Sequence, residues 1–357
     1  MELFSPLKLK SLDPHNIPEV LDTWFDQNER LMPWRETRDP YRIWLSEIIL
    51  QQTRVAQGTP YYLAFINQFP TIEKLANAPE DEVLKLWQGL GYYSRARNLH
   101  FAAKQVMMEF SGEFPNQYSS ILKLKGVGPY TASAIASIAF GEKRAAVDGN
   151  VIRVISRLFG ISEDTNQSVT QNTIQKLADE LIKDSNPGRH NQAMMEFGAM
   201  QCVPKNPNCQ NCPLSEYCIA LKNQWVDQIP LKVKKLKRRS RYFHYFIIQD
   251  DSNVWLHRRS ENDIWNGLYQ FPLIESSSNE LNLPDAVFSI LGSLSVEMIK
   301  SNKAKKHVLS HQDIYATFHH IKVKCLPESS FISSKLNEVH TFALPRLIDR
   351  YLESNDF

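Results

Sequence analysis

Residues 202–218 read CVPKNPNCQNCPLSEYC and place four cysteines, Cys202, Cys209, Cys212 and Cys218, in the pattern C-x6-C-x2-C-x5-C. Thiols this close in sequence converge on one object, which is a pair of disulfides, a zinc ion or an iron–sulfur cluster. The other cysteine of the chain, Cys325, lies in an apolar alternating run, which predicts a buried strand thiol.

The composition is that of an ordinary globular protein. Of 357 residues 43% are hydrophobic and 22% charged, and the net charge is +2. No run of eighteen apolar residues occurs, so we expect no membrane span. The first ten residues lack the apolar core of a secretory signal, which favours a reducing compartment, where disulfides are rare. A metal site is therefore favoured at the four cysteines, and any affinity for nucleic acid must come from local charged patches.

The chain changes character near residue 230. Before it, apolar residues recur with helical spacing over 17–25, 41–50, 59–69, 80–90, 96–110, 131–140, 151–159, 169–182 and 192–200. After it come a predicted hairpin of 242–249 with 254–258, strands at 313–320 and 321–325, and helices at 285–291 and 346–352. We predict an all-α domain at 1–225, a basic linker at 226–241 and a smaller α+β domain at 242–357.

Residues 122–132, LKLKGVGPYTA, join two expected helices through the turn Gly126-Val127-Gly128. Glycines let the backbone approach a partner closely, and Pro129 suits a first helical turn. The free N–H groups of that turn and the helix dipole attract an anion. This is the helix-hairpin-helix pattern, which binds a DNA phosphate without reading sequence. The alternative is an ordinary tight turn between two helices.

Two carboxylates stand in unlike surroundings. Glu47 lies within the apolar helix of residues 44–53, WLSEIILQQT, where burial would raise its pKa. Asp148 opens a helix in residues 147–151, VDGNV, where backbone donors favour its ionised form. Taken singly, they are a salt-bridge partner and an N-cap. As a pair in unlike surroundings they could supply an acid and a charged carboxylate to one site.

From about Trp24 to Cys218 the chain resembles the helix-hairpin-helix DNA glycosylases, the group that includes endonuclease III. In that group a four-cysteine loop with this spacing holds a [4Fe–4S] cluster, whereas zinc more often uses two close C-x2-C pairs. Bifunctional members carry an attacking lysine where this chain has Tyr130. The motifs around Glu47, Tyr130 and Asp148, with residues 90–97, LGYYSRAR, are similar to those of the MutY-type adenine DNA glycosylases.

The resemblance implies a monofunctional enzyme of base excision repair. It would flip adenine mispaired with 8-oxoguanine or guanine out of double-stranded DNA and hydrolyse its N-glycosidic bond. Glu47 would be the general acid at the adenine ring, and Asp148 would stabilise the sugar, with or without transient covalent attachment. Tyr130 and Asn150 would support Asp148. The adenine pocket would be lined by Arg30, Trp34, Leu50 and Gln192. The gap in the DNA stack would be contacted by Gln52, Leu90 and Tyr92, and the DNA backbone by Gly126 and Gly128.

The second domain contains residues 265–272, WNGLYQFP, which resemble a region of Nudix folds. Active Nudix enzymes carry a glutamate-rich metal-binding helix, but residues 275–291 hold just three acids. We therefore predict an inactive Nudix-like domain that recognises the lesion. In the MutY-type glycosylases the recognition loop of this domain has an F-S-H core. Ser310 and His311 match it, with Leu309 in place of the aromatic residue.

Three rival interpretations remain, and one of them is a zinc-stabilised scaffold, which would lack the visible absorption of an iron–sulfur cluster. An endonuclease III-like enzyme would act on oxidised pyrimidines, but Tyr130 and the second domain oppose it. A non-catalytic iron–sulfur DNA-binding protein would have no reason to hold Glu47 and Asp148 together. We expect a monomer in the cytoplasm of a bacterial-type cell, associated with the nucleoid.

Overall fold

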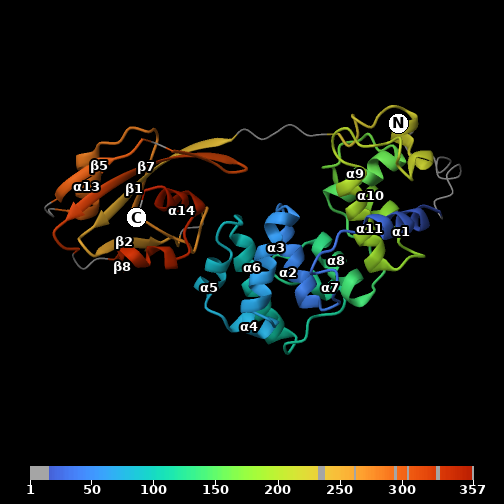
Figure 1. Cartoon of the computed structure of the whole chain (residues 1–357), viewed down its shortest axis with the longest axis horizontal. Coiled ribbons are helices and arrows are strands. Elements are labelled where there is room, and N and C mark those ends of the chain that lie inside the picture. Colours follow the sequence, from blue (N-terminus) through green and yellow to red (C-terminus); the bar gives the residue numbers. More distant parts are fainter. Residues whose placement is uncertain are drawn as a thin grey trace. The chain divides into compact units, whose positions relative to one another are not determined.

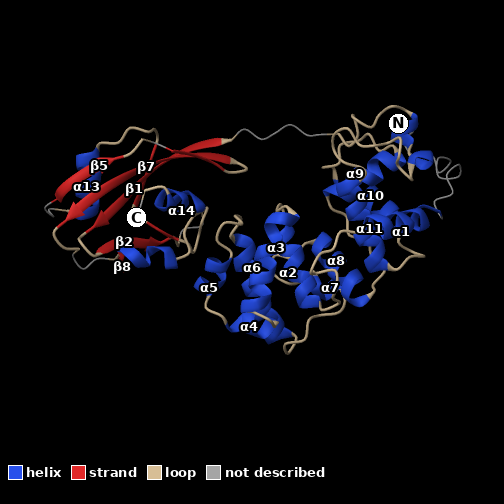
Figure 2. Cartoon of the chain, in the orientation of Figure 1, coloured by secondary structure: helices blue, strands red, loops and turns tan. Residues whose placement is uncertain are grey.

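The computed structural model of the chain divides into two compact units. It describes residues 16–231, 238–260, 263–292, 296–303, 305–326 and 330–355. One unit comprises residues 1–76 and 101–234, and the other comprises residues 77–100 and 235–357. Helices build the first unit, and the second holds the strands (Figure 1, Figure 2).

The expected domain bounds, 1–225, 226–241 and 242–357, stay a prediction. Within the expected basic linker, residues 232–237 lie outside the described residues. Residues 1–15, which include the segment expected not to be a secretory signal, lie outside them as well.

The first unit consists of helices joined by short turns. They are α1 (Ile17–Asn28), α2 (Pro40–Leu50), α3 (Val55–Gln68), α7 (Tyr118–Ile121), α8 (Pro129–Phe140), α9 (Gly149–Phe159), α10 (Ser168–Leu181), α11 (Pro187–Met200), η3 (Ser215–Tyr217) and α12 (Ile219–Lys222). Two further helices, α4 (Ile72–Asn77) and α6 (Ser94–Glu109), give residues to both units.

Every helix expected from apolar spacing is found, but one is shorter than predicted. The helix expected over 80–90 is α5 (Glu80–Leu86). It stops early because Gly89, Gly91 and Tyr92 all take left-handed backbone angles, which cannot continue a right-handed helix. The short helices α4 and α7 escape prediction because they hold too few residues to show a period.

One hydrophobic core of the first unit lies where α1, α9, α10 and α11 meet. There the rings of Trp24 and Phe197 pack edge to face, with centroids 5.0 Å apart.

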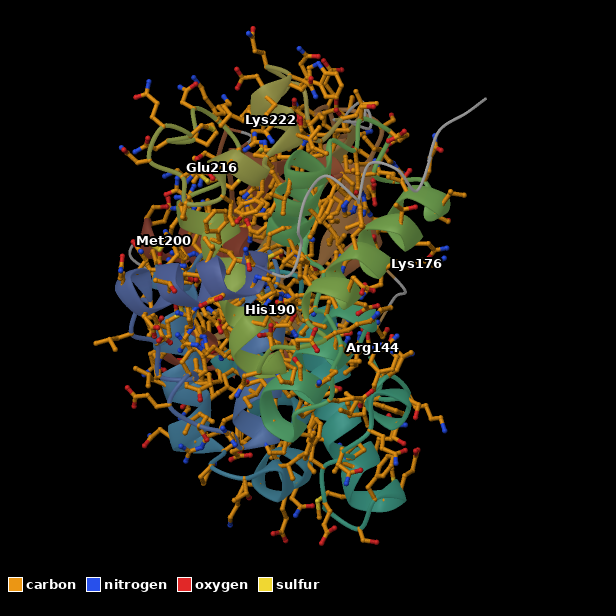
Figure 3. All side chains as sticks on the ribbon, turned by 90° about the vertical axis from the view of Figure 1, so that its right-hand side faces the viewer. Arg144, Lys176, His190, Met200, Glu216 and Lys222 are labelled. Carbon is orange, nitrogen blue, oxygen red and sulfur yellow. The ribbon has the colours of Figure 1, made fainter. Side chains whose placement is uncertain are left out.

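Lys176 and Lys222 are exposed, while His190 is buried (all labelled in Figure 3). Burial lowers the pKa of His190 to about 4, so this side chain stays neutral within the core.

The second unit is built on a mixed sheet. Its described strands are β1 (Arg239–Gln249), β2 (Asn253–Arg258), β3 (Tyr269–Gln270), β4 (Leu273–Ser276), β5 (Val296–Ser301), β6 (Lys305–Val308), β7 (Gln312–Val323) and β8 (Ile332–Lys335). The central pair, β1 and β7, is parallel, and the other pairings are antiparallel.

Helices cover both faces of this sheet. Successive side chains of β1 point to opposite faces. Phe243 and Tyr245 share a core with Ile348 of α14 (Arg346–Glu353), whereas Phe246 shares one with Val287 of α13 (Leu283–Leu291). The predicted α+β fold is confirmed.

The hairpin expected at 242–258 is confirmed, since β1 and β2 pair antiparallel at Gln249 and Val254. The two strands expected at 313–320 and 321–325 are instead the single strand β7, which pairs with β1 along its length. The prediction of a buried strand thiol at Cys325 is wrong. The strand ends at Val323, and Cys325 is exposed in the bend that follows.

Candidate active site

The hairpin of residues 122–132 presents the start of α8. Gly126 takes a φ of 78°, Gly128 is the N-cap of α8, and Pro129 opens the helix. A methyl group added at Gly128 would meet no atom within 4 Å. The backbone at this helix start can therefore be approached closely on that side, as a phosphate site of this kind requires.

Glu47 is held by α2 and faces a pocket. Its neighbours Ser46 and Ile48 are buried, whereas Glu47 itself is half-buried and lines the pocket. Burial among protein atoms raises the pKa of Glu47 to about 7, and the nearby Asp148 carboxylate adds to this effect. The polar hydroxyl of Tyr130 and the charge of Arg35 oppose it. At neutral pH a substantial fraction of Glu47 therefore carries a proton that it can donate.

Asp148 caps the N-terminus of α9. Its Oδ1 accepts from the backbone N–H groups of Asn150 and Val151, both at 2.8 Å, and its Oδ2 accepts from the Asn150 amide at 2.8 Å. Burial raises the pKa of Asp148, while these donors and the charge of Arg153 oppose the rise. The donors expected to favour the ionised form are thus present, but the net shift is upward.

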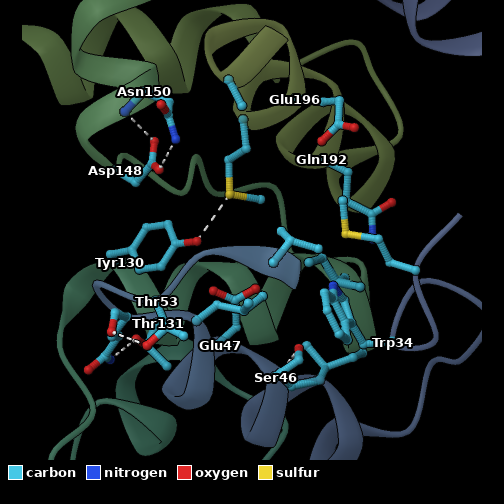
Figure 4. Close-up of a pocket in the computed structure, with 18 of the residues that line it drawn as sticks. Trp34, Ser46, Glu47, Thr53, Tyr130, Thr131, Asp148, Asn150, Gln192 and Glu196 are labelled. Atoms are coloured by element: carbon cyan, nitrogen blue, oxygen red, sulfur yellow. Dashed lines mark hydrogen bonds between the residues drawn. The ribbon is translucent and has the colours of Figure 1, made fainter. Parts of the chain in front are cut away.

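Tyr130 lies between the two carboxylates in Figure 4, on the first turn of α8. Its hydroxyl donates to the Met195 sulfur at 3.0 Å. Burial raises the pKa of Tyr130 well above its ordinary value, and the charges of Glu47 and Asp148 reinforce the effect. Tyr130 therefore stays a neutral phenol, a hydrogen-bond donor with no nucleophilic amine.

One cavity of about 740 Å³ gathers most of the residues implied by the resemblance. This volume is in the range of small-molecule sites. Its lining includes Arg30, Trp34, Glu47, Leu50, Gln52, Gly126, Gly128, Tyr130, Asp148, Asn150 and Gln192. The roles assigned to these residues stay predictions.

Sequence reasoning missed an ion-paired group in the same cavity. Glu196 on α11 is 2% exposed, and its Oε2 accepts from Arg30 at 2.8 Å and from Arg35 at 2.9 Å. Burial acts to raise the pKa of Glu196, but the hydrogen bonds from both arginines hold it below the ordinary value. The signal in the sequence is the one that identified Glu47, an acid within an apolar helix.

The four cysteines lie together on a smaller pocket that Arg157 also lines. Burial raises the pKa of the Cys212 thiol to about 11, so bound metal is needed to keep it ionised. Among the described residues, no group of three or more His, Cys, Asp or Glu side chains is placed to hold a single metal ion.

Helix α9 joins this loop to the carboxylate cavity. Arg153 donates to the Cys202 carbonyl at 2.7 Å and to the Asn150 side chain at 2.9 Å, and Arg157 donates to the Cys202 sulfur at 3.4 Å. Helix α11 packs against the start of α9 so closely that a methyl group added at Gly198 would lie 2.7 Å from the Asn150 Cβ. Asn150 is thus fixed from two sides.

The residues expected at the gap in the DNA stack differ in exposure. Gln52 and Tyr92 are exposed and take left-handed φ angles of 56° and 49°, which non-glycine residues keep only where their surroundings impose them. Leu90 is 7% exposed and would have to move to contact DNA. The DNA contacts of all three stay predictions.

In the second unit, Ser310 and His311 are exposed on the turn between β6 and β7. The Ser310 hydroxyl is hydrogen bonded to the Tyr92 hydroxyl. Leu309 is partly buried and packs against the core of the unit.

Three family models match the chain. Residues 45–180 match the HhH-GPD superfamily of base excision DNA repair proteins, residues 202–218 the iron–sulfur binding domain of endonuclease III, and residues 244–354 the NUDIX domain. The hairpin, the carboxylate cavity and the cysteine loop thus define a DNA glycosylase of the helix-hairpin-helix superfamily. Its cysteine loop is a [4Fe–4S] site, which Cys202, Cys209, Cys212 and Cys218 would ligate.

Relatives similar in sequence show to which family of DNA glycosylases the chain belongs. An adenine DNA glycosylase of Buchnera aphidicola (from Schizaphis graminum) is 32% identical over 94% of this chain and 97% of its own length. The human adenine DNA glycosylase is 42% identical over 58% of this chain and 39% of its own. The chain belongs to the adenine DNA glycosylase family.

Solved structures agree with the fold of the first unit. A thermostable thymine-DNA glycosylase aligns with a TM-score of 0.56 and 30% identity, over 60% of this chain and 99% of that one. An endonuclease III trapped as a covalent intermediate with DNA aligns with a TM-score of 0.51 and 25% identity, over the same shares. In the described part of the chain, no helix has the length and apolar character needed to cross a bilayer.

Proposed function

We propose that the chain excises adenine mispaired with 8-oxoguanine or guanine in duplex DNA, and that it does so without cutting the strand. The observation that carries the proposal is the Glu47–Tyr130–Asp148 arrangement in one cavity, with unlike carboxylates and no amine at position 130. The adenine must leave the stack to enter this cavity, because the glycosidic bond is shielded within a duplex.

The chemistry follows from the environments of the two acids. Glu47 donates its proton to a ring nitrogen of adenine as the bond between C1′ and the base breaks, and the bonding electrons leave with the base. Asp148 faces the sugar and stabilises the positive charge left on it. Water then adds to C1′ and returns a proton to Glu47, which restores the acid.

The other cavity residues hold the base. Trp34 offers an aromatic face, and Gln192 offers both a donor and an acceptor for an adenine edge. The ion pair of Arg30 and Arg35 with Glu196 keeps three charged groups in place at the cavity wall. Asn150 holds Asp148 in position and is itself held by Arg153.

Recognition of the opposite base is assigned to the second unit. Ser310 and His311 supply exposed polar groups, and Tyr92 supplies an exposed ring bonded to Ser310. These groups can reach a base edge and stack on it, which the buried cavity cannot do. We expect the chain to work as a monomer at the genome, which in a bacterial cell is the nucleoid.

The test is excision under single-turnover conditions from duplexes with adenine opposite 8-oxoguanine, guanine or cytosine. We expect release of free adenine, fastest opposite 8-oxoguanine, with the strand left intact. Borohydride should trap no covalent enzyme–DNA adduct of the Schiff-base type. Efficient trapping, or excision of an oxidised pyrimidine in place of adenine, would contradict the proposal.

A further inference from the structure

Within the second unit, a lysine fastens residues 77–100 to the segment just before α14. Lys85 of α5 directs its ammonium at three acceptors, the carbonyls of His340 at 2.5 Å and Phe342 at 3.1 Å and the side-chain oxygen of Gln88 at 3.0 Å. An ammonium carries three hydrogens, so these contacts use all of them. His340 lies in the 3-10 helix η4 (Leu336–Thr341), near its C-terminal end, where carbonyls attract a cation.

Gln88 closes the same contact. Its side-chain oxygen also accepts from the Leu344 backbone N–H at 3.3 Å. Burial lowers the pKa of Lys85, as expected for an ammonium drawn partly out of water into a protein contact. We call Lys85, Gln88 and the backbone of residues 340–344 the clasp.

A further hydrogen bond and an ion pair hold α5 against β2 and β3. The Tyr269 hydroxyl donates to Asp81 at 2.7 Å, and Arg258 pairs with Glu80 at 3.1 Å. A methyl group added at Gly267 would lie 3.3 Å from Leu84, so the backbone here packs tightly on α5.

The loop that leaves the clasp leads to the recognition turn. Tyr92 comes four residues after Gln88, and its hydroxyl is bonded to Ser310. The Arg95 guanidinium lies over the Tyr92 ring at 5.7 Å and over the Trp87 ring at 5.0 Å. The left-handed backbone conformation of Tyr92 is therefore stabilised by neighbouring side chains as well as by Ser310.

We propose that Lys85 and Gln88 are positioning residues for selectivity toward the base opposite adenine. The clasp holds the loop that carries Tyr92, and so keeps Tyr92 and Ser310 in register with each other. This inference rests on the proposed function of the recognition turn. It requires no contact between the clasp and DNA, and it leaves the chemistry of the carboxylate cavity unchanged.

The experiment measures the ratio of single-turnover excision rates opposite 8-oxoguanine and opposite guanine. Lys85→Met should lower this ratio roughly three- to tenfold, the effect of losing one or two net hydrogen bonds. The matched control is Lys74→Met on α4, an exposed lysine outside the clasp, which should leave the ratio unchanged. Lys85→Arg keeps hydrogen-bond donors and should recover part of the ratio.

A double-mutant cycle with Ser310→Ala separates positioning from general destabilisation. Because both changes act on one contact, their effects on the ratio should not add. Additive effects, or an unchanged ratio in Lys85→Met, would overturn the inference. Gln88→Met provides the same test if Lys85→Met does not fold. A wild type that shows no preference for 8-oxoguanine overturns the proposed function instead, before any variant is made.

Discussion

The carboxylate cavity and the recognition turn are built in opposite ways. Glu47, Tyr130 and Asp148 come from three separate helices of one unit and converge below the surface, where burial raises the pKa of each. Ser310 and His311 are neighbours on an exposed turn. Proton transfer benefits from groups withdrawn from water, whereas reading a base requires groups that reach out to it.

This contrast makes a sharp distinction between two kinds of variant. A change in the cavity should slow excision by a similar factor whatever base lies opposite adenine. A change at the turn should alter the ratio of excision rates opposite 8-oxoguanine and opposite guanine. It should leave the rate opposite guanine unchanged. For Asp148→Asn, Gly198→Ala and Ser310→Ala, both the excision rate and the ratio between mispairs are to be measured.

Among the three variants that compare the cavity with the turn, Asp148→Asn should have the largest effect. Loss of the charge that stabilises the sugar should slow single-turnover excision roughly 10²- to 10⁴-fold on all mispairs. Asp184→Asn, an exposed aspartate of the same unit, is the control and should act as wild type. A large loss on one mispair alone would break the distinction between cavity and turn.

A smaller loss is expected for Gly198→Ala. The added methyl group would lie 2.7 Å from the Asn150 Cβ and 2.9 Å from its carbonyl oxygen, so Asn150 or α11 must shift. A displacement of this kind should slow excision roughly 10- to 100-fold on every mispair. The absorbance of the cluster and the thermal unfolding midpoint, measured alongside, report whether the fold persists. A folded variant with the wild-type rate would show that the position of Asn150 is unimportant.

The smallest effect is expected for Ser310→Ala. Removing one hydroxyl should lower the preference for 8-oxoguanine over guanine roughly three- to tenfold and leave the rate opposite guanine unchanged. Ser252→Ala, at an exposed turn of the same unit, serves as the matched control. Equal slowing on both mispairs would assign Ser310 to the chemistry rather than to recognition.

Short local patterns marked the two carboxylates and the glycine hairpin, whereas the resemblance to the DNA glycosylases supplied the other predicted residues of the cavity. Glu47 is an acid in an apolar helix, Asp148 is an acid at a helix start, and Tyr130 follows the glycine hairpin. Glu196 satisfies the same criterion as Glu47, but its ion pairs with Arg30 and Arg35 span more than 160 residues of chain and leave no local trace.

Contacts of high sequence separation account for what sequence could not predict. Residues 77–100 lie within the part of the chain matched by the glycosylase model, yet they pack with the sheet unit. The hydrogen bond between Asp81 and Tyr269 joins residues 188 positions apart. Leu309 packs against the core of the second unit, which its place beside Ser310 and His311 in the sequence did not indicate.

The central claim is that protonated Glu47 delivers the proton that releases adenine. Its pKa is raised to about 7, so the acid form predominates below that pH and is lost above it. The most direct test is the pH dependence of single-turnover excision opposite 8-oxoguanine, for the wild type, Glu47→Gln and the exposed control Glu73→Gln.

The wild type and Glu73→Gln should excise fastest below pH 7 and slow about tenfold for each pH unit well above it, as Glu47 loses its proton. Glu47→Gln should be slower by roughly 10²- to 10⁴-fold and show no such fall with pH, because an amide cannot donate a proton in this way. A Glu47→Gln variant that excises at the wild-type rate, or a wild-type rate that rises through pH 7, would contradict the claim.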